Sequence, residues 1–581
     1  LTRDCRMTST SGMELEIRFP KIHHFWMDAG LIGFYELAES EHPEEWNVSI
    51  SLDDAGIALR GDGKDLESFF EHVYNILLDR YYNTSSEQQR ADKAGFYYDT
   101  RLDAFVRFPK VKCRGIAALI FDKAPRPTKG SVKYRGKGIL PPEYEHLQER
   151  FEEFLRENNL KAGAMQNLLI DGPNAYQPRV VLFEKNVLTS PKKSRSKGAC
   201  FICGHDSDVL TEVGSSVFPL ITGKDGVLSF NSTCGNPAKV CWKCDYIGKF
   251  VPVAGFYATN ETGCHIYFPY SSSLVKMHEV FRSLEAIKVD DPNYFRNFNQ
   301  DLGGYFQKPY EMLFSFLYSM YLRVLSSHDS SDEEEEELHG FDFAKFYQIT
   351  TARAPLDFVV MYTEPLGQTH MAKMVWPFKR SVYVFRLLDR LERGGIRIKE
   401  VMRELIDFEQ DKNEYKTLMR NRVCERILNQ QRIVDLVEQH VFHINKSKAQ
   451  YIKPLHDFTI AYEKILIEER DPMQQELIDA AVSLGKTIGM SLAQEGKKGK
   501  GELFRLRKAR KPEDFLNEVN RIQLNYGALV TSDLYNRGEE FEKNFTEFKQ
   551  FCMIAALNTF NGMSRDRESA GSHDQATGEA A

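Results

Sequence analysis

The stretches CFIC (Cys200–Cys203) and CWKC (Cys241–Cys244) stand 37 residues apart in the chain. A CxxC turn presents two thiolates on one side of a metal ion, and two such turns supply the four sulfur ligands of a tetrahedral zinc site. A site closed by four cysteines leaves no coordination position for a substrate. We therefore predict a structural zinc ion held by Cys200, Cys203, Cys241 and Cys244.

The remaining cysteines are scattered, which is typical of metal usage in a reducing compartment and not of a disulfide framework. They are Cys5, Cys113, Cys234, Cys264, Cys424 and Cys552. His205 and Cys234 lie close enough in sequence to replace one of the four ligands. The pair Cys264-His265 is further away and is a weaker alternative.

With 581 residues the chain is too long for one core, and three to four domains are expected. Hydrophobic residues make up 42% of it, enough to form cores, so global disorder is not expected. No stretch approaches the ~20 apolar residues of a membrane span, and the N-terminus lacks a signal-peptide pattern. We expect a soluble, intracellular protein. Residues 1–12 suggest an expression-derived or upstream extension before a natural start at Met13.

Residues 13–195 predict a mixed α/β body. Leu15, Ile17 and Phe19 alternate as in a strand, and two further alternating runs flank Asp53-Asp54-Ala55-Gly56, which indicates a hairpin. A helix is predicted to begin near Asp65, a good N-cap residue. Residues 123–142 and 185–198 are expected to be basic, flexible loops.

Helical periodicity dominates after the cysteine module, over 275–325 and 380–450. Between these stretches, Phe358–Tyr362 and Val382–Val384 suggest strands. From Pro454 onward nearly everything predicts helix. Asp471-Pro472 marks one helix start, and an apolar stripe of phenylalanines from Phe541 to Phe551 ends near Gly562.

The predicted fold class is α+β: an N-terminal α/β body, an inserted zinc-binding module and an all-α C-terminal bundle. The expected divisions are the extension 1–12, the body 13–195, the zinc module 196–270, a mostly helical remainder 271–453 with an acidic loop at 329–337, the helical bundle 454–564 and a disordered tail 565–581.

Charge is distributed unevenly although the net charge is only −7. Acidic residues are concentrated in the run 332–337, and basic residues in the segments 123–137, 192–197 and 497–511. Each basic segment alone is typical of a solvated face. Three of them in one acidic protein favour phosphate binding.

Sequence signals of catalysis are weak. The nucleotide-binding pattern GxxxxGK[ST] and the nucleophile pattern GxSxG are both missing from the chain. Gly303-Gly304 lacks the aspartate pair of a nucleotide-cyclising palm domain. The His-Asp pairs at His205, His328, His456 and His573 are dispersed, whereas a metal-dependent nuclease needs converging ligands. We predict a protein that is not an enzyme.

The chain resembles the large subunit of type I-B CRISPR Cascade complexes, the kind with a CxxC…CxxC module. The resemblance is carried by FWMDAGLIGFYELAE (residues 25–39) with the hairpin NVSISLDDAGIALRG, by GACFICG…GNPAKVCWKCDYIG, and by the helical C-terminal region. It covers nearly the whole chain from Met13. The zinc module is its most specific part.

This resemblance implies a non-catalytic subunit of a crRNA-guided surveillance complex in the cytoplasm of a prokaryote. Such a subunit recognises the protospacer-adjacent motif in double-stranded DNA, promotes R-loop formation for antiviral defence, and leaves cutting to a separate protein. The implied partners are crRNA, the Cascade backbone subunits, and either a helicase–nuclease or a transposition adaptor. The alternative is a zinc-containing CRISPR-associated nuclease or palm-domain enzyme.

Candidate DNA contacts follow from residue chemistry, because the motif-reading residues of the family vary. Small polar and basic residues on a zinc scaffold suit a groove or a phosphate backbone, although an ordinary loop has the same composition. The candidates in the zinc loop are Lys224, Asn231, Ser232, Asn236 and Lys239. The candidates elsewhere are Lys129, Lys133, Arg135, Lys137, Lys497, Lys498, Lys500, Arg505, Arg507 and Lys508.

The small subunit of this CRISPR subtype resembles the large subunit's C-terminal bundle and can arise from internal translation. Met473 directly follows Asp471-Pro472, and initiation there would give a mostly helical piece of residues 473–581. Met419 and Met490 are alternative starts.

Overall fold

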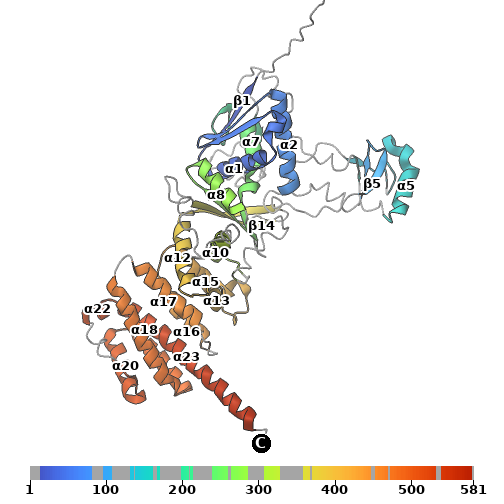
Figure 1. Cartoon of the computed structure of the whole chain (residues 1–581). Helices are drawn as coiled ribbons and strands as arrows, with labels where there is room; N and C mark the ends of the chain where they lie inside the picture. The colour runs from blue at the N-terminus through green and yellow to red at the C-terminus, as the bar shows by residue number, and fades with distance from the viewer. Residues whose placement is uncertain are drawn as a thin grey trace, which may run out of the picture. The chain divides into compact units, whose positions relative to one another are not determined.

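The chain divides into two compact units in the computed structural model, which Figure 1 draws with the element labels used below. Unit 1 comprises Leu1–Phe295 and Ala344–Lys379, and unit 2 comprises Arg296–Phe343 and Arg380–Ala581. The structure describes residues 14–81, 96–107, 131–136, 138–160, 167–170, 198–207, 210–212, 239–259, 263–285, 302, 306–326, 357–366, 369–446, 450, 452–468, 472–530 and 538–578.

The first sheet of unit 1 is antiparallel, with strand order β1-β3-β2, and confirms the predicted hairpin. Its strands are β1 (Leu15–Pro20), β2 (Ser49–Asp53) and β3 (Gly56–Gly61). Asp53 pairs with Gly56, and the Asp53 carboxylate accepts the Ala55 N–H at 2.8 Å, which closes the turn. Gly56 has φ +149°, a conformation that side chains disfavour.

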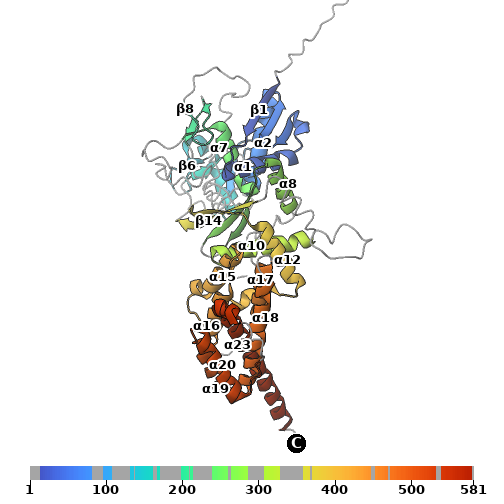
Figure 2. The ribbon, with the colours of Figure 1, turned by 90° about the vertical axis from the view of Figure 1, so that its left-hand side faces the viewer.

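Helix α1 (Phe25–Ser40) crosses the centre of unit 1 and contacts the zinc-module helix α7 (Trp242–Gly248) and the turn η5 (Val251–Ala254). Figure 2 shows α1 beside α7. The approach is so close that a Cβ added at Gly33 would lie 2.2 Å from the Phe250 carbonyl oxygen. The two glycines of the stretch 25–39 therefore let α1 and the zinc module share one core.

Aromatic side chains fill that core. Phe34 and Phe250 have ring centroids 5.2 Å apart, and Tyr246 lies 5.3 Å from Phe70 of helix α2 (Gly63–Tyr81). The Tyr246 hydroxyl donates to the Phe70 carbonyl at 2.9 Å, so its one polar group is satisfied. The predicted cap of α2 is wrong by one turn: the Asp62 carboxylate, not that of Asp65, accepts the Lys64 N–H at 2.9 Å.

A second antiparallel sheet completes unit 1, in the order β12-β13-β14-β15. Its strands are β12 (Phe256–Thr259), β13 (Cys264–Tyr270), β14 (Asp357–Leu366) and β15 (Thr369–Phe378), and helix α8 (Leu274–Glu285) follows β13. The strand predicted at Phe358–Tyr362 is confirmed. It belongs to unit 1, so the remainder expected over 271–453 is not one body.

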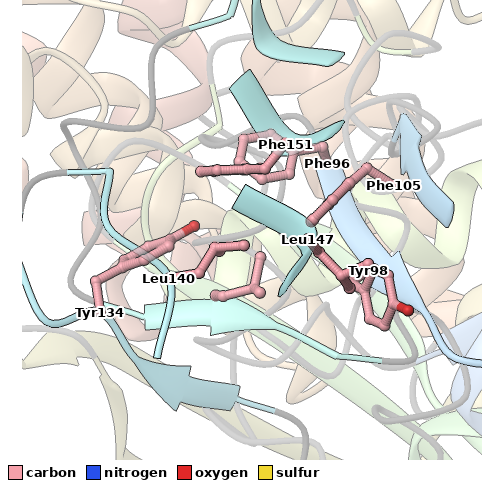
Figure 3. Packing of buried hydrophobic residues seen from close by; sticks show 8 residues of the cluster. Phe96, Tyr98, Phe105, Tyr134, Leu140, Leu147 and Phe151 are labelled. Atoms are coloured by element: carbon pink, nitrogen blue, oxygen red, sulfur yellow. The ribbon is translucent and has the colours of Figure 1, made fainter. Parts of the chain in front are cut away.

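The described residues of 96–107, 131–136, 138–160 and 167–170 form a small lobe with its own core, shown in Figure 3. Its elements are β4 (Phe96–Asp99), β5 (Ala104–Arg107), β6 (Ser131–Lys133), β7 (Asn167–Leu169), η2 (Pro142–Leu147) and α5 (Gln148–Glu157). Phe151 lies 5.0 Å from Phe105, ring to ring, and Tyr134 is buried beside it. The loop predicted over 123–142 is therefore wrong at residues 131–134, where β6 pairs with β7 and leads into this core.

Unit 2 is helical throughout its described residues. Its helices are α10 (Pro309–Ser326), α12 (Ser381–Arg393), α13 (Ile398–Glu404), α14 (Asn413–Lys416), α15 (Leu418–Leu428), α16 (Val434–Ile444), α17 (Lys453–Glu468), α18 (Pro472–Ala493), α19 (Lys497–Arg507), α20 (Pro512–Tyr526), α22 (Gly538–Lys543) and α23 (Phe545–Gly578). The predicted helix start at Pro472 is confirmed.

Two sequence predictions for unit 2 need correction. Val382–Val384 lies in α12 and not in a strand, because a three-residue apolar run fits either period. The helices from α12 to α16 agree with the helical periodicity predicted over 380–450. Helix α23 passes through Gly562 to Gly578, so it extends into the tail predicted to be disordered; a glycine in a helix interior lowers its stability without ending it.

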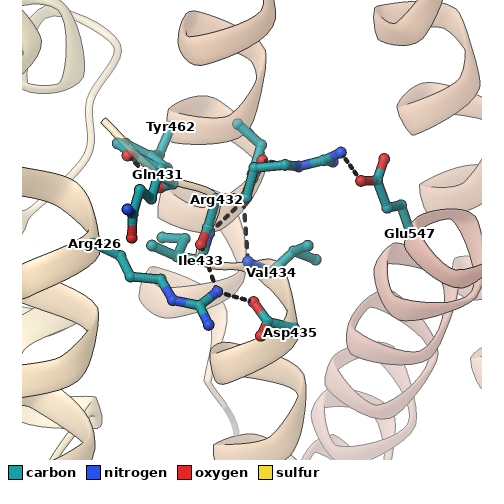
Figure 4. A network of polar contacts seen from close by, with 9 residues as sticks. Arg426, Gln431, Arg432, Ile433, Val434, Asp435, Tyr462 and Glu547 are labelled. Atoms are coloured by element: carbon teal, nitrogen blue, oxygen red, sulfur yellow. Dashed lines mark hydrogen bonds and ion pairs between the residues drawn. The ribbon is translucent and has the colours of Figure 1, made fainter. Parts of the chain in front are cut away.

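The core of unit 2 contains buried charge. Arg420 and Glu311, both almost inaccessible, form an ion pair of 2.7 Å between α15 and α10. Glu463 of α17 accepts the N–H groups of Ile433 and Val434 at 2.7 and 3.0 Å, which satisfies the start of α16. Figure 4 shows the surrounding network, in which Arg432 also reaches Glu547 on α23.

Close helix packing also stabilises unit 2. Helices α18 and α23 lie side by side, and a Cβ added at Gly485 would lie 2.2 Å from the Cys552 carbonyl oxygen. Across the part of the chain that the structure describes, no helix is long and apolar enough to cross a membrane.

Candidate metal centre

Two short antiparallel ladders position the cysteine pairs. Strand β8 (Gly198–Ala199) pairs with β9 (Asp206–Ser207), and the Cys200 N–H donates to the His205 carbonyl at 2.8 Å. Strand β10 (Leu210–Glu212) pairs with β11 (Lys239–Cys241), which runs directly into α7. The Phe201 N–H donates to the Lys239 carbonyl at 2.9 Å and joins the two ladders.

The four predicted ligands converge. The sulfur atoms of Cys200, Cys203, Cys241 and Cys244 all lie within 4.8 Å of one another, and all four are free thiols. The Cys203 and Cys241 sulfurs are 3.8 Å apart. Ligands at 2.3 Å from a tetrahedral zinc are about 3.8 Å from each other, whereas a disulfide bond is about 2.05 Å long. The cluster thus has the spacing of a metal site and not of a disulfide.

The electrostatics of the cluster also fit a cation. Hydrogen bonds from the thiols of Cys241 and Cys244 hold the pKa of Cys200 well below its usual range, and the N–H groups of Cys203 and Cys241 act in the same direction. The hydrogen bond with Cys200 raises the pKa of Cys241 to about 12, and that of Cys244 also rises. Crowded thiolates repel one another, so all four ionise together only with a cation between them.

Lys243 supplies positive charge beside the sulfurs. Burial lowers the pKa of its ammonium group, and the neighbouring cysteines oppose that shift. Its Nζ donates to the Arg18 carbonyl at 2.8 Å and lies 5.7 Å from the centre of the Trp242 ring. A four-thiolate zinc site carries net charge −2, which this ammonium partly offsets. The contact with Arg18 ties the cluster to strand β1.

A cavity of about 600 Å³ lies next to the cluster, within unit 1. Its walls are mostly apolar. They include the apolar residues Phe19, Met27, Leu31 and Trp242 and the polar residues Arg18 and His205. The volume and lining are typical of a pocket that receives an aromatic or apolar group. The sequence alone did not indicate this cavity, because its lining residues come from β1, α1 and α7. These elements are spread over more than 200 residues of the chain.

Of the alternative metal ligands suggested by the sequence, those within the described residues lie outside the cluster. His205 is exposed and lies outside the cluster, although its carbonyl supports the Cys200 turn. Cys264 and His265 are buried in β13 and are not among the grouped ligand atoms. Burial lowers the pKa of His265 to about 3, so the ring is neutral. Cys234 lies outside the described residues.

The predicted DNA contacts of the zinc module fall mainly on undescribed sequence. Lys224, Asn231, Ser232 and Asn236 lie outside the described residues. Lys239 is exposed on β11, opposite Glu212 in the ladder. Its side chain is therefore available at the edge of the metal module.

The basic segment 123–137 is described only in part, and Lys129 and Lys137 lie outside that part. Lys133 is exposed at the end of β6. Arg135 forms an exposed ion pair of 3.4 Å with Glu145. Lys133 is thus the better phosphate-binding candidate of the two.

The segment 497–511 forms α19 and the turn after it, and its charges are partly neutralised. Arg505 pairs with Glu518 at 3.1 Å, and Arg507 makes a bidentate contact with Glu438 at 2.6 and 2.9 Å. Lys498 lies 5.8 Å from the Tyr526 ring centre. The remaining predicted contacts, Lys497, Lys500 and Lys508, carry no ion pair within the described residues.

A further group that the sequence did not indicate lies between α1 and α8. Ligand atoms of Glu36, Glu39 and His278 fall within 4.8 Å of one another. His278 Nε2 lies 2.8 Å from Glu36, and Arg282 lies 3.6 Å from Glu39. Since each carboxylate already contacts a side chain of α8, this group joins α8 to α1.

Comparison with known proteins adds no identification. None of the protein-family models matches this sequence, and no curated protein matches it.

Proposed function

We propose that this chain is the non-catalytic large subunit of a type I-B crRNA-guided surveillance complex. The observation that carries the proposal is the closed cluster of Cys200, Cys203, Cys241 and Cys244 at metal spacing, within a core shared with α1. The cysteine module and residues 25–39 are two of the three features on which the resemblance rests. We propose zinc as the metal, because four thiolates at this spacing suit its tetrahedral preference.

In this proposal the metal braces a DNA-inspecting surface. The 37 residues between the cysteine pairs leave and re-enter the cluster through β10 and β11. Lys239 stands at the point of re-entry. Four sulfur ligands fill a tetrahedral zinc, so the metal itself activates neither water nor substrate. Its role is to fix the loop that contacts the duplex.

The direct test is to purify the tagged full-length chain from its native host and to sequence the RNA that accompanies it. The proposal expects CRISPR-repeat-derived guides, together with backbone subunits in the same fraction. A preparation with no repeat-derived RNA above the level of an untagged control would contradict it.

DNA contact is tested separately in the purified complex. Replacing Lys497, Lys500 and Lys508 by glutamine is expected to weaken target-duplex binding. The slope of log affinity against log salt is negative, and each lost phosphate contact should reduce its magnitude by about 0.9. The matched control replaces Arg505 and Arg507, whose charges are already paired. An equal loss of slope in the control would overturn the assignment to α19.

The alternative is a zinc-containing nuclease or palm-domain enzyme. Its test is incubation of the purified chain with duplex and single-stranded DNA in Mg²⁺ or Mn²⁺. Cleavage that disappears on replacing a His-Asp pair, such as His456-Asp457, would favour the enzyme. In the structure His456 contacts its own neighbour Asp457 at 2.8 Å, within the first turn of α17.

We also propose that translation from Met473 yields a small subunit. The close packing of Gly485 of α18 against Cys552 of α23 lies wholly inside such a piece. A start at Met490 would remove Gly485, and a start at Met419 would add α15 to α17. Mass spectrometry of the native complex without any such short chain would defeat this proposal.

A further inference from the structure

Unit 2 contains a cavity of about 470 Å³ that neither the zinc module nor α19 explains. It lies among the connection from α13 to α14, the start of α15 and the C-terminal half of α16. It is lined by Asp407, Gln410, Tyr415, Lys416, Leu418, Met419, Arg422, Gln439, His440, His443, Lys446 and Arg507. Its volume falls in the range of about 300–1,000 Å³ that is typical of small-ligand sites.

The charge of the lining is predominantly positive. Lys416, Arg422 and Lys446 have no ion pair among the described residues, and Arg422 and Lys446 are exposed. The one carboxylate of the lining, Asp407, lies 3.2 Å from His443. Arg507 is held by Glu438. Three cationic side chains are thus left to bind an anion. All three line the same cavity, which distinguishes them from dispersed surface charges.

The start of helix α15 adds to this positive field. No side-chain hydrogen bond caps the helix, and the Oγ1 of its N-cap residue Thr417 is buried without a partner among the described residues. The N-terminal N–H groups of an 11-residue helix favour an anion nearby. Leu418 and Met419 of this first turn line the cavity, so an anion inside it lies close to the helix end.

An aromatic side chain stands at the same cavity. Tyr415 is 50% exposed and Leu418 is 43% exposed, so both offer apolar surface at the cavity. The Nζ atom of Lys412 lies over the Tyr415 ring, 5.9 Å from its centre. An exposed ring beside unpaired cations is the combination that binds a base by stacking and its phosphate by charge.

We propose that this cavity binds a nucleotide, with its phosphates at Lys416, Arg422 and Lys446 and its base against Tyr415. This inference is independent of the proposed function, because it uses no residue of the metal module.

The test is a titration of the full-length chain with a fluorescent mant-labelled ADP. Saturable binding is expected, with inorganic phosphate as a competitor. The double variant Lys416→Glu/Arg422→Glu should weaken binding at least tenfold. Lys486→Glu, which changes an exposed lysine of α18 outside the cavity, should stay within twofold of the parent.

Two further variants separate the base site from general charge. Tyr415→Ala is expected to weaken binding several-fold, whereas Tyr415→Phe, which keeps the ring, should bind like the parent. Lys446→Ala serves as a milder phosphate-site variant if the double variant loses its circular-dichroism spectrum.

The proposal is overturned if mant-ADP does not bind saturably, or if Lys486→Glu weakens binding as much as the double variant. It is also overturned if an unphosphorylated single-stranded DNA of ten thymidines binds this cavity more tightly than the nucleotide and with the same loss in the variants. That result would make the cavity part of a strand-binding surface.

Discussion

Unit 1 and unit 2 stabilise their folds in different ways. In unit 1 a cluster of thiols joins segments about 40 residues apart, and an aromatic core around Tyr246 packs it against α1. In unit 2 buried ion pairs join distant segments. The pair of Arg420 with Glu311, for example, links residues that lie 109 positions apart in the sequence. In our proposal the cysteine cluster of unit 1 needs an added ion, whereas Arg420 and Glu311 of unit 2 neutralise each other.

Tryptophan makes this comparison measurable in the intact chain. All four tryptophans, Trp26, Trp46, Trp242 and Trp376, belong to unit 1. Tryptophan fluorescence therefore follows unit 1 alone, while the circular-dichroism signal at 222 nm is dominated by the helices of unit 2. A substitution in unit 1 should change the tryptophan fluorescence, and a substitution in unit 2 should change the signal at 222 nm.

Loss of the metal should have the largest effect, and it should be confined to unit 1. Structural zinc contributes an apparent binding free energy of about 10–16 kcal/mol to domains that depend on it. Cys241→Ser should release the ion, shift the fluorescence of Trp242 and lower the melting temperature seen by fluorescence. Cys264→Ala, which alters a buried cysteine outside the cluster, should leave the fluorescence spectrum unchanged. If Cys241→Ser shifted only the unfolding transition at 222 nm, the assignment of the metal's effect to unit 1 would be wrong.

Breaking a buried ion pair should come next, and it should affect unit 2. Glu311→Gln leaves Arg420 charged and without its partner, which should cost about 3–5 kcal/mol in the free energy of unfolding. Urea unfolding at 222 nm measures it. The matched control in unit 1 is Glu16→Gln, which removes an exposed pair with Arg60 and should cost less than about 1 kcal/mol. Equal costs for the two variants would remove the distinction between the units.

The third effect is a pH dependence of unit 1. Burial raises the pKa of Asp28 to about 6, from about 3.9 in an unfolded chain. Protonated Asp28 is thus favoured in the fold, and its contribution is fully present below about pH 4 and lost as the pH rises through 6. Asp28→Asn should match the parent near pH 4 and exceed its stability by about 1–3 kcal/mol at pH 7.5. Urea unfolding by fluorescence at both pH values tests this, and a variant less stable at pH 7.5 would refute it.

The smallest effects concern helix packing in unit 2. Gly485→Ala places a methyl group against the Cys552 carbonyl and should cost about 1–3 kcal/mol. Gly501→Ala lies inside α19 with nothing within 4 Å, so it should stabilise by about 0.5–1 kcal/mol. Both are measured at 222 nm. The same sign for both substitutions would mean that close packing does not govern α18 and α23.

Sequence reasoning succeeded where the deciding residues are local. The CxxC spacing identified the four cysteines that converge, and the Asp-Asp-Ala-Gly turn identified the β2–β3 hairpin. It failed at Val382–Val384, where three residues fit a helix as well as a strand. The cap of α2 was misplaced because Asp62 and Asp65 are both good N-cap residues.

Features assembled from distant segments were beyond such reasoning. Glu311 and Arg420 each look like ordinary surface residues until α10 packs on α15. Likewise Lys416, Arg422 and Lys446 show no motif spacing, and only the packing of α15 against α16 brings them to one cavity. The cavity beside the cysteines depends in the same way on β1, α1 and α7.

The central claim is that one metal ion is bound by the four cysteines of unit 1. Elemental analysis by mass spectrometry of the purified full-length chain tests it most directly. We expect one zinc per chain in the parent and in Cys264→Ala, and less than a tenth of that in Cys241→Ser. A parent without zinc or another thiolate-binding metal, or a Cys241→Ser variant that keeps the full amount, would contradict the claim.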